Sequence, residues 1–197
     1  PGDRGARRAA AAGERPILAG RRGEAVSRLA TELGLEARVF ALDDPAAVDR
    51  GLDGARAVLH CAGPFSRTSA PMAEACLRAH VHYLDITGEI EVFEGMAARH
   101  TAAQHAGVTL LPGVGFDVVP SDCLSLHVAR RLPDACRLRI GVSRTDAVSR
   151  GSMKTVLEQW SDTVAIRRGG ALSAVPLGQL ERRFDYGRGA CPSAAVS

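Results

Sequence analysis

The stretch PILAGRRGEAVSRLATELG, residues 16–34, combines a strand pattern with a helix pattern that follows it at once. Its first five residues form a mainly apolar run that ends in glycine, which predicts a short strand over residues 16–20. Apolar residues then recur at helical spacing, which predicts a helix over residues 23–33 with one apolar face. Gly34 follows, as is typical of a helix C-terminal cap. The stretch is therefore one strand–helix unit.

The same alternation continues on both sides of this unit. Further strands are predicted at residues 38–42, 55–61, 82–86 and 108–111. Further helices are predicted at residues 2–12, 69–79 and 89–106, with a short one that Asp44 caps and Pro45 begins. Strands that alternate with helices form parallel, right-handed units. The predicted fold class is therefore α/β, a doubly wound parallel sheet.

The pattern changes after residue 120. We expect a helix at residues 121–131, a half-buried strand at 137–143, a second helix at 153–160 and then hairpins and loops. We therefore divide the chain into an α/β domain at residues 1–119 and the opening of a smaller α+β domain at residues 120–197.

Paired arginines, Arg21 and Arg22, follow the strand at residues 16–20. In dinucleotide-binding domains an acid at this strand end selects NAD, whereas an arginine accommodates the 2′-phosphate of NADP. Guanidinium groups suit a phosphate, so the pair favours NADP. The alternative is two solvated arginines that begin a helix. Gly2 stands just ahead of the first helix, where the last glycine of a phosphate-binding turn is expected.

Several classes of protein are disfavoured by composition. The net charge is only +3 and opposite charges are interspersed, so we expect no nucleic-acid partner. No apolar run approaches the roughly 20 residues of a membrane span. The five cysteines have irregular spacing, which is typical of reduced thiols in a cytoplasmic protein. His80 and His82 have no third ligand at a telling distance, so we expect no metal.

Four motifs then appear in order: PILAGR, HCAGPFSRTSAPMAEAC, HYLDITGE and LLPGVGFDVVPSD. Together they resemble the saccharopine dehydrogenase-like oxidoreductases, and above all the actinobacterial branch that includes trans-acting enoyl reductases. The resemblance covers roughly residues 1 to 160. It implies that residues 1–119 are an N-terminal NADP-binding Rossmann domain that lacks its first strand. It also implies that residues 120–197 are part of a second α+β domain that completes the substrate cleft and often a dimer interface. Against this pattern, the chain is expected to be truncated at both ends.

The resemblance also implies roles for individual residues. Arg21 contacts the 2′-phosphate, and Asp43 lies near the adenine. The passage towards the nicotinamide is lined by Cys61, Ala62, Gly63 and Pro64. The substrate cleft is edged by Asp85, Thr87, Gly88 and Glu89. Its floor is formed by Gly113, Gly115, Phe116 and Asp117.

Some roles stay open. The CAGPF motif is either a site of close cofactor approach or a plain strand-to-helix turn. Cys61 has no adjacent base, so a buried, inert thiol is favoured over a nucleophile. Asp85 and Glu89 could form an acid/base pair, or Asp85 could cap the turn while Glu89 begins the next helix. No catalytic residue is assigned.

The leading hypothesis is an NADP-dependent oxidoreductase that transfers hydride to or from a carbonyl, imine or enoyl group of a small or lipid-like substrate. A homodimer through the second domain fits this hypothesis. The alternatives are a non-catalytic nucleotide-binding Rossmann module and an inactive, truncated fragment.

Overall fold

The structure is a computed structural model that describes residues 2–116, 118–142, 163–187 and 189–194. The chain divides into two compact units, residues 1–126 and residues 127–197, and each is described by itself. The predicted helix at residues 153–160 and the candidate residue Asp117 lie outside the described residues.

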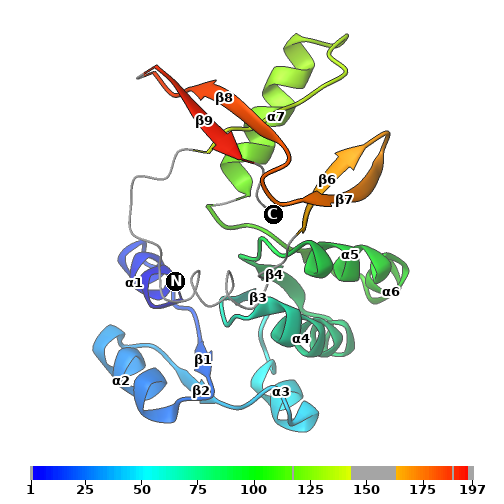
Figure 1. The fold of residues 1–197 in the computed structure, drawn as a ribbon. Helices are drawn as coiled ribbons and strands as arrows, with labels where there is room; N and C mark the ends of the chain where they lie inside the picture. The colour runs from blue at the N-terminus through cyan, green and yellow to red at the C-terminus, as the bar shows by residue number, and fades with distance from the viewer. Residues whose placement is uncertain (1, 117, 143–162, 188, 195–197) are drawn as a thin grey trace. The chain divides into compact units, whose positions relative to one another are not determined.

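The first unit alternates strands with helices, which confirms the predicted α/β class (Figure 1). Its strands are β1 (Leu18–Gly20), β2 (Ala37–Val39), β3 (Ala57–His60), β4 (His82–Asp85) and β5 (Leu110–Leu111). Its helices are α1 (Gly2–Ala11), α2 (Gly23–Leu33), α3 (Pro45–Gly51), α4 (Phe65–Ala79), α5 (Ile90–Ala98) and α6 (His100–Ala106). Helix α7 (Val119–Arg131) runs across the boundary between the units.

The strand pairs of the first unit are all parallel. β1 pairs with β2, with Leu18 opposite Ala37. β3, β4 and β5 form a separate ladder in that order, with Val58 opposite Tyr83 and Tyr83 opposite Leu110. The strands are shorter than predicted, since the apolar runs extend past the last ladder hydrogen bond. Parallel strands place their carboxyl ends at one edge of the sheet.

Local sequence signals determine two helix ends as predicted. Helix α2 spans Gly23–Leu33, and Gly34 follows it in the left-handed conformation with φ 65°. Glycine adopts this conformation without a steric cost. Asp44 precedes α3, and its carboxylate accepts a hydrogen bond from the Ala47 N–H at 3.0 Å. Pro45 then occupies the first helical turn.

The predicted long helix at residues 89–106 is wrong, because the chain forms two helices, α5 and α6, that meet at Arg99. The Arg99 Nε donates to Glu74 Oε1 at 2.7 Å, and its Nη1 donates to the Gly95 carbonyl at 2.8 Å. Glu74 belongs to α4, so this ion pair connects the junction between α5 and α6 to α4. Helix α4 also begins at Phe65, earlier than the predicted start at residue 69.

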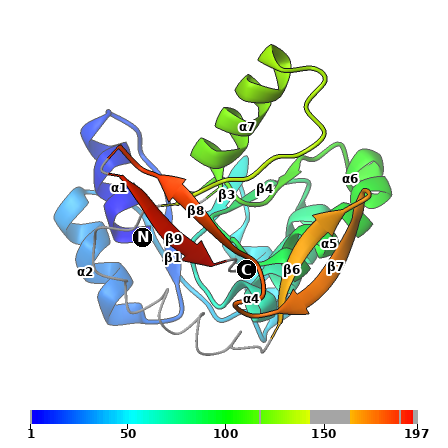
Figure 2. The same ribbon diagram turned by 45° about the horizontal axis from the view of Figure 1, so that its top comes forward.

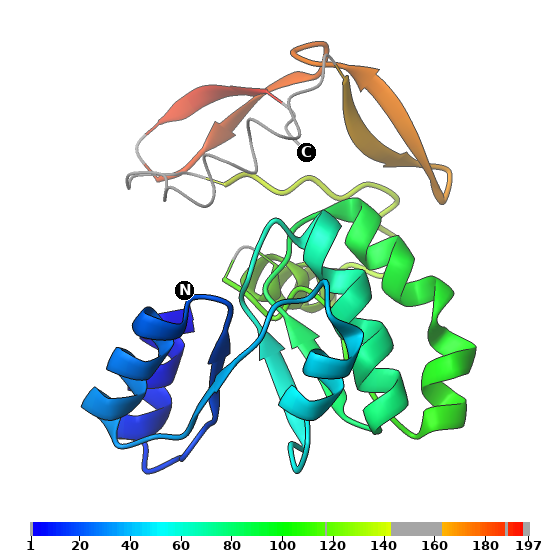
Figure 3. The same ribbon diagram turned by 90° about the horizontal axis from the view of Figure 1, so that it is seen from below.

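The main core lies on one face of the β3–β4–β5 ladder, beneath α3, α4 and α5. Its largest fully buried side chain is Tyr83 of β4. On the other face Leu59, Leu84 and Leu111 stand opposite one another in register. Leu59 is 55% exposed and Leu111 is 47% exposed, so this face is only partly covered. Figure 3 shows α1 and α2, in blue, packed together beside β1.

The second unit contains two antiparallel hairpins (Figure 2), as expected for its end. They are β6 (Thr163–Arg168) with β7 (Ala171–Pro176), and β8 (Glu181–Asp185) with β9 (Ala190–Ala194). The predicted strand at 137–143 is wrong for its described residues 137–142, which are exposed and belong to no strand. No helix among the described residues is long and apolar enough to cross a membrane.

Candidate functional site

The candidate site lies at the carboxyl ends of β3, β4 and β5, where one buried loop connects the neighbouring turns. Asp85, fully buried, ends β4, and its Oδ2 accepts a hydrogen bond from Tyr83 Oη at 2.6 Å. Its Oδ1 accepts from the N–H groups of Thr87 and Gly113, both at 2.9 Å. The Asp85 carbonyl accepts from the Val114 N–H at 2.7 Å. Asp85 therefore ties the end of β4 to the loop after β5.

Glu89 extends this network to the turn after β3. Its carboxylate accepts hydrogen bonds from the backbone N–H of Phe65 at 3.0 Å and of Ser66 at 2.7 Å. Its own N–H donates to Thr87 Oγ1 at 3.0 Å. The expectation that Glu89 serves the N-terminus of its own helix needs correction: it begins α5, but its carboxylate caps α4. Glu89 is buried, and each of its carboxylate oxygens accepts a hydrogen bond.

The turn at residues 61–64 presents backbone to solvent. Ala62 and Gly63 are exposed, and no described residue accepts a hydrogen bond from their N–H groups. Thr68 Oγ1 donates to the Ala62 carbonyl at 2.6 Å and lies 3.0 Å from the Pro64 carbonyl. The turn is therefore held from inside while two amide donors stay open. This geometry therefore fits both alternatives for the CAGPF motif, a plain strand-to-helix turn and a site where a cofactor comes close to the backbone.

His60, just before this turn, and Cys61, its first residue, are poor acid/base groups. Burial raises the pKa of the Cys61 thiol, which disfavours the reactive thiolate. Burial also lowers the pKa of His60 to about 4, so its imidazole is neutral at pH 7. Its Nε2 has no hydrogen-bond partner among the described residues. Neither the Cys61 thiol nor the His60 imidazole is therefore suited to act as a nucleophile or a general base.

Internal packing accounts for two of the predicted cleft glycines. Gly113 has φ 75°, and a Cβ there would lie 2.6 Å from Phe93 Cζ. A Cβ on Gly115 would lie 3.1 Å from Ile86 Cβ. Gly88 differs, because a Cβ there would meet nothing within 4 Å. Phe116 is 88% exposed, so among the described residues its apolar ring is left largely uncovered beside this edge.

The paired arginines lie at the carboxyl end of β1 and are exposed. No described residue forms an ion pair or a side-chain hydrogen bond with Arg21 or Arg22. Arg22 stands at the N-cap of α2 and makes no side-chain cap there. Asp43, on the loop after β2, is also exposed. The two guanidinium groups, which no described residue binds, stand ahead of α2 and form a basic surface suited to an anion.

Gly2 links the start of α1 to the turn after β3. A Cβ on Gly2 would lie 3.5 Å from Cys61 Cβ, so the two backbones lie close together. The structure thus brings the N-terminus of α1 next to the open amides of residues 62 and 63. A helix N-terminus and free backbone amides both favour a negatively charged group.

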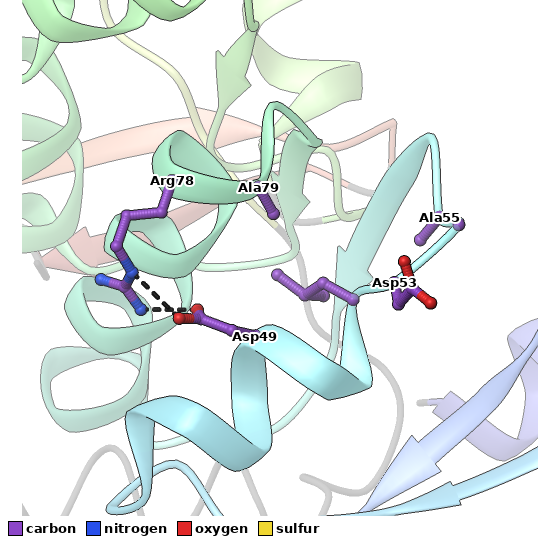
Figure 4. A pocket seen from close by; sticks show the side chains of 7 residues that line it. Asp49, Asp53, Ala55, Arg78 and Ala79 are labelled. Carbon is purple, nitrogen blue, oxygen red and sulfur yellow. Dashed lines mark hydrogen bonds and ion pairs between the residues drawn. The ribbon is translucent and has the colours of Figure 1, made fainter.

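One pocket of the first unit lies away from these residues. A pocket of about 320 Å³ is lined by residues from the ends of α3 and α4 and from the loop before β3 (Figure 4): Asp49, Leu52, Asp53, Gly54, Ala55, Arg78 and Ala79. Arg78 Nη2 pairs there with Asp49 Oδ1 at 2.7 Å. This pocket is at the amino end of β3 and contains none of the predicted site residues.

The histidine pair is engaged with backbone groups. His80 Nδ1 lies 2.8 Å from the Ala106 carbonyl, and His82 Nδ1 accepts from the Thr109 N–H at 3.0 Å. Among the described residues no group of three or more potential ligands could hold a metal ion.

The network reveals two residues that the sequence analysis left without a role. Tyr83 anchors Asp85, and the alternation of β4 could have indicated it, since residues two apart share a face. Thr68 binds the turn at 61–64 one helical turn away, which is a usual geometry for a threonine near a helix start.

The sequence profile of the saccharopine dehydrogenase NADP binding domain matches residues 6–111, more than half of the chain. The chain belongs to this family. The profile begins within α1 and ends with β5, so it covers the turn at residues 61–64 and the loop at residues 85–89, but neither Gly2 nor the loop after β5.

Relatives of this NADP-binding family agree with the assignment. A saccharopine dehydrogenase-like oxidoreductase of Mus musculus is 30% identical over 105 residues, which cover 53% of this chain and 24% of the mouse protein. A trans-acting enoyl reductase of Mycobacterium leprae is 31% identical over 124 residues, 60% of this chain and 30% of that protein. The chain thus spans less than a third of these relatives.

Among solved structures, apo saccharopine dehydrogenase (L-Glu forming) from Saccharomyces cerevisiae superposes with a TM-score of 0.64. The match covers 96% of this chain and 46% of the yeast chain at 14% identity. It shows a shared fold, and the family and fold expected from the four motifs are confirmed.

Proposed function

We propose that this chain binds NADP(H) as the nucleotide-binding part of an oxidoreductase. The observation that carries the proposal is the pair Arg21 and Arg22, exposed and without ion-pair partners among the described residues, at the carboxyl end of β1. Guanidinium groups bind phosphate monoesters through paired hydrogen bonds. NADP differs from NAD by one phosphate monoester, the 2′-phosphate. The family's NADP-binding domain supports the same cofactor.

The remaining candidate residues have separate proposed roles along the carboxyl ends of the strands. The start of α1 at Gly2 and the open amides of Ala62 and Gly63 offer donors to the pyrophosphate. Asp43 lies beyond β2, where the adenosine half of the cofactor would bind. Cys61 and Pro64 flank the open amides and direct the backbone of the turn. When bound, the cofactor supplies the hydride; the chain's residues bind and orient it.

The substrate side of the site lies at the ends of β4 and β5. The exposed residues Gly88 and Phe116 would contact substrate, while Asp85, Thr87, Gly113 and Gly115 shape the loops from within. Asp117, outside the described residues, stays a candidate from the family resemblance alone. The substrate is proposed to carry a carbonyl, an imine or a polarised C=C, as the name of the mycobacterial relatives suggests for the last.

The broader assignments follow from this function. Residues 1–119 form the proposed cofactor domain, and residues 120–197 belong to a second domain that contributes to substrate binding or to a homodimer. A lipid-like substrate is proposed by analogy with the enoyl reductase relatives. The five cysteines are all free thiols, which fits the proposed reducing, cytoplasmic location.

Calorimetric titration with NADP tests the proposed clamp. We expect Arg21→Ala to weaken NADP binding by about tenfold or more, because a charge-assisted hydrogen bond to phosphate is lost. Arg28→Ala is the matched control, since it removes an exposed arginine from the middle of α2. Equal affinities of wild type and Arg21→Ala would contradict the proposed clamp.

A further inference from the structure

Helix α4 is capped by a side chain from a distant part of the chain. Its N-cap residue, Pro64, offers no side-chain acceptor. The free N–H groups of a helix's first turn need partners, and the helix dipole favours a negative charge there. The Glu89 carboxylate supplies both the acceptors and the negative charge. One of its oxygens accepts a hydrogen bond from the Phe65 N–H and the other accepts one from the Ser66 N–H. A carboxylate 3% exposed is thus a permanent part of the turn.

The loop that carries Glu89 is itself fixed. Thr87 accepts a hydrogen bond from the Glu89 N–H, and Asp85 accepts one from the Thr87 N–H. These three side chains are all at most 3% exposed. Their hydrogen bonds connect the ends of β3, β4 and β5, so a change at Glu89 would be transmitted to the turn after β3.

The turn is held from two sides. Thr68 binds the carbonyls of Ala62 and Pro64, and Glu89 binds the first amides of α4. The N–H groups of Ala62 and Gly63, which lie between these anchors, have no partner among the described residues. The anchors fix the direction in which these two donors point.

We propose that Glu89 is a positioning residue for the cofactor: it occupies the N-terminus of α4 in place of a phosphate and holds the turn at residues 61–64 open to the nicotinamide half of NADP. This inference rests on the proposed NADP function. Because the Glu89 carboxylate already neutralises the positive end of α4, the cofactor's pyrophosphate is left to the start of α1 and to the open amides of Ala62 and Gly63, and its 2′-phosphate to Arg21.

Two ligands distinguish positioning from a general loss of structure. Adenosine 2′,5′-bisphosphate carries the adenosine and the 2′-phosphate but lacks the nicotinamide half, whereas NADP carries both. We would measure the affinity of each for the full chain and for Glu89→Gln and Glu89→Ala. Glu91→Gln is the matched control, because Glu91 is an exposed glutamate in the first turn of α5.

We expect Glu89→Gln to weaken NADP binding by about tenfold and Glu89→Ala by more, since a charged acceptor of two amides is lost. Binding of adenosine 2′,5′-bisphosphate should be unchanged in both variants and in Glu91→Gln. A loss that is equal for the two ligands, or no loss for either, would overturn the proposed role of Glu89.

Hydrogen exchange of the Phe65 and Ser66 amides gives a readout that needs no cofactor. Glu89→Gln should speed their exchange by about tenfold relative to wild type and Glu91→Gln. Unchanged exchange would overturn the anchoring role whatever the ligands show. If the wild-type chain binds neither ligand while the exchange changes as expected, the NADP function fails and the anchoring of the turn by Glu89 stands.

Discussion

At the scale of single residues, His60 is a buried imidazole with an orphaned nitrogen. It ends β3, its ring meets the Phe65 ring edge-on with centroids 5.7 Å apart, and its Nε2 has no partner among the described residues. Burial lowers its pKa from 6.5 to about 4, although the nearby Asp85 carboxylate opposes part of this shift. The folded chain therefore holds this side chain neutral where the unfolded chain would protonate it.

The sign of the resulting pH dependence follows directly. Between pH 6.5 and about pH 4 the unfolded chain binds a proton at His60 that the folded chain does not, so acidification destabilises the fold. We expect wild type to lose about 3 kcal/mol more than His60→Leu over this range. Urea unfolding at a series of pH values measures this difference. His127→Leu, which removes an exposed histidine, should keep the wild-type slope; the same slope in His60→Leu would refute the assignment.

Residue-scale roles were only partly predictable from the sequence. The strand-end position of Arg21 and Arg22 depends on local pattern alone, and the structure has β1 ending at Gly20. The target of Glu89 does not depend on local pattern, because its partners Phe65 and Ser66 are more than 20 residues away. Only folding brings them together. The packing of Gly113 against Phe93 and of Gly115 against Ile86 likewise depends on the tertiary fold, and the place of these glycines at the floor of a substrate cleft stays a prediction.

At the scale of elements, helix α3 offers a matched pair of adjacent aspartates. Asp44 caps the helix through the Ala47 N–H, whereas Asp43 is exposed and no described residue binds its side chain. We expect Asp44→Ala to lower the free energy of unfolding by about 1 kcal/mol. Asp43→Ala should change it by less than about 0.5 kcal/mol. Urea unfolding of both variants measures the difference, and equal losses would contradict the capping assignment.

Elements were predicted best where one local signal determines them. The amphipathic spacing and glycine stop of α2 gave both of its ends, and the Asp44-Pro45 pair gave the start of α3. The break at Arg99 was missed because no glycine or proline marks it in the sequence; in the structure the Arg99 side chain pairs with Glu74 of another helix. The alternation at residues 137–142 predicted a strand, but a strand needs a partner, and the described residues provide none.

At the scale of the whole molecule, the resemblance of four motifs in order predicted the family, and the alternation of strands with helices predicted the α/β fold. The profile match over residues 6–111 and the yeast structure confirm both. The arrangement of the second unit was less predictable, because hairpins form from pairings that apolar spacing alone does not specify. Its two hairpins were expected only in outline.

We propose that this chain distinguishes NADP from NAD by the 2′-phosphate, which Arg21 and Arg22 would bind. Calorimetric titration of the wild-type chain with each cofactor measures this preference. We expect NADP to bind at least about tenfold more tightly than NAD, because only NADP carries the phosphate that the two guanidinium groups can bind. Equal affinities for the two cofactors, or tighter binding of NAD, would contradict it.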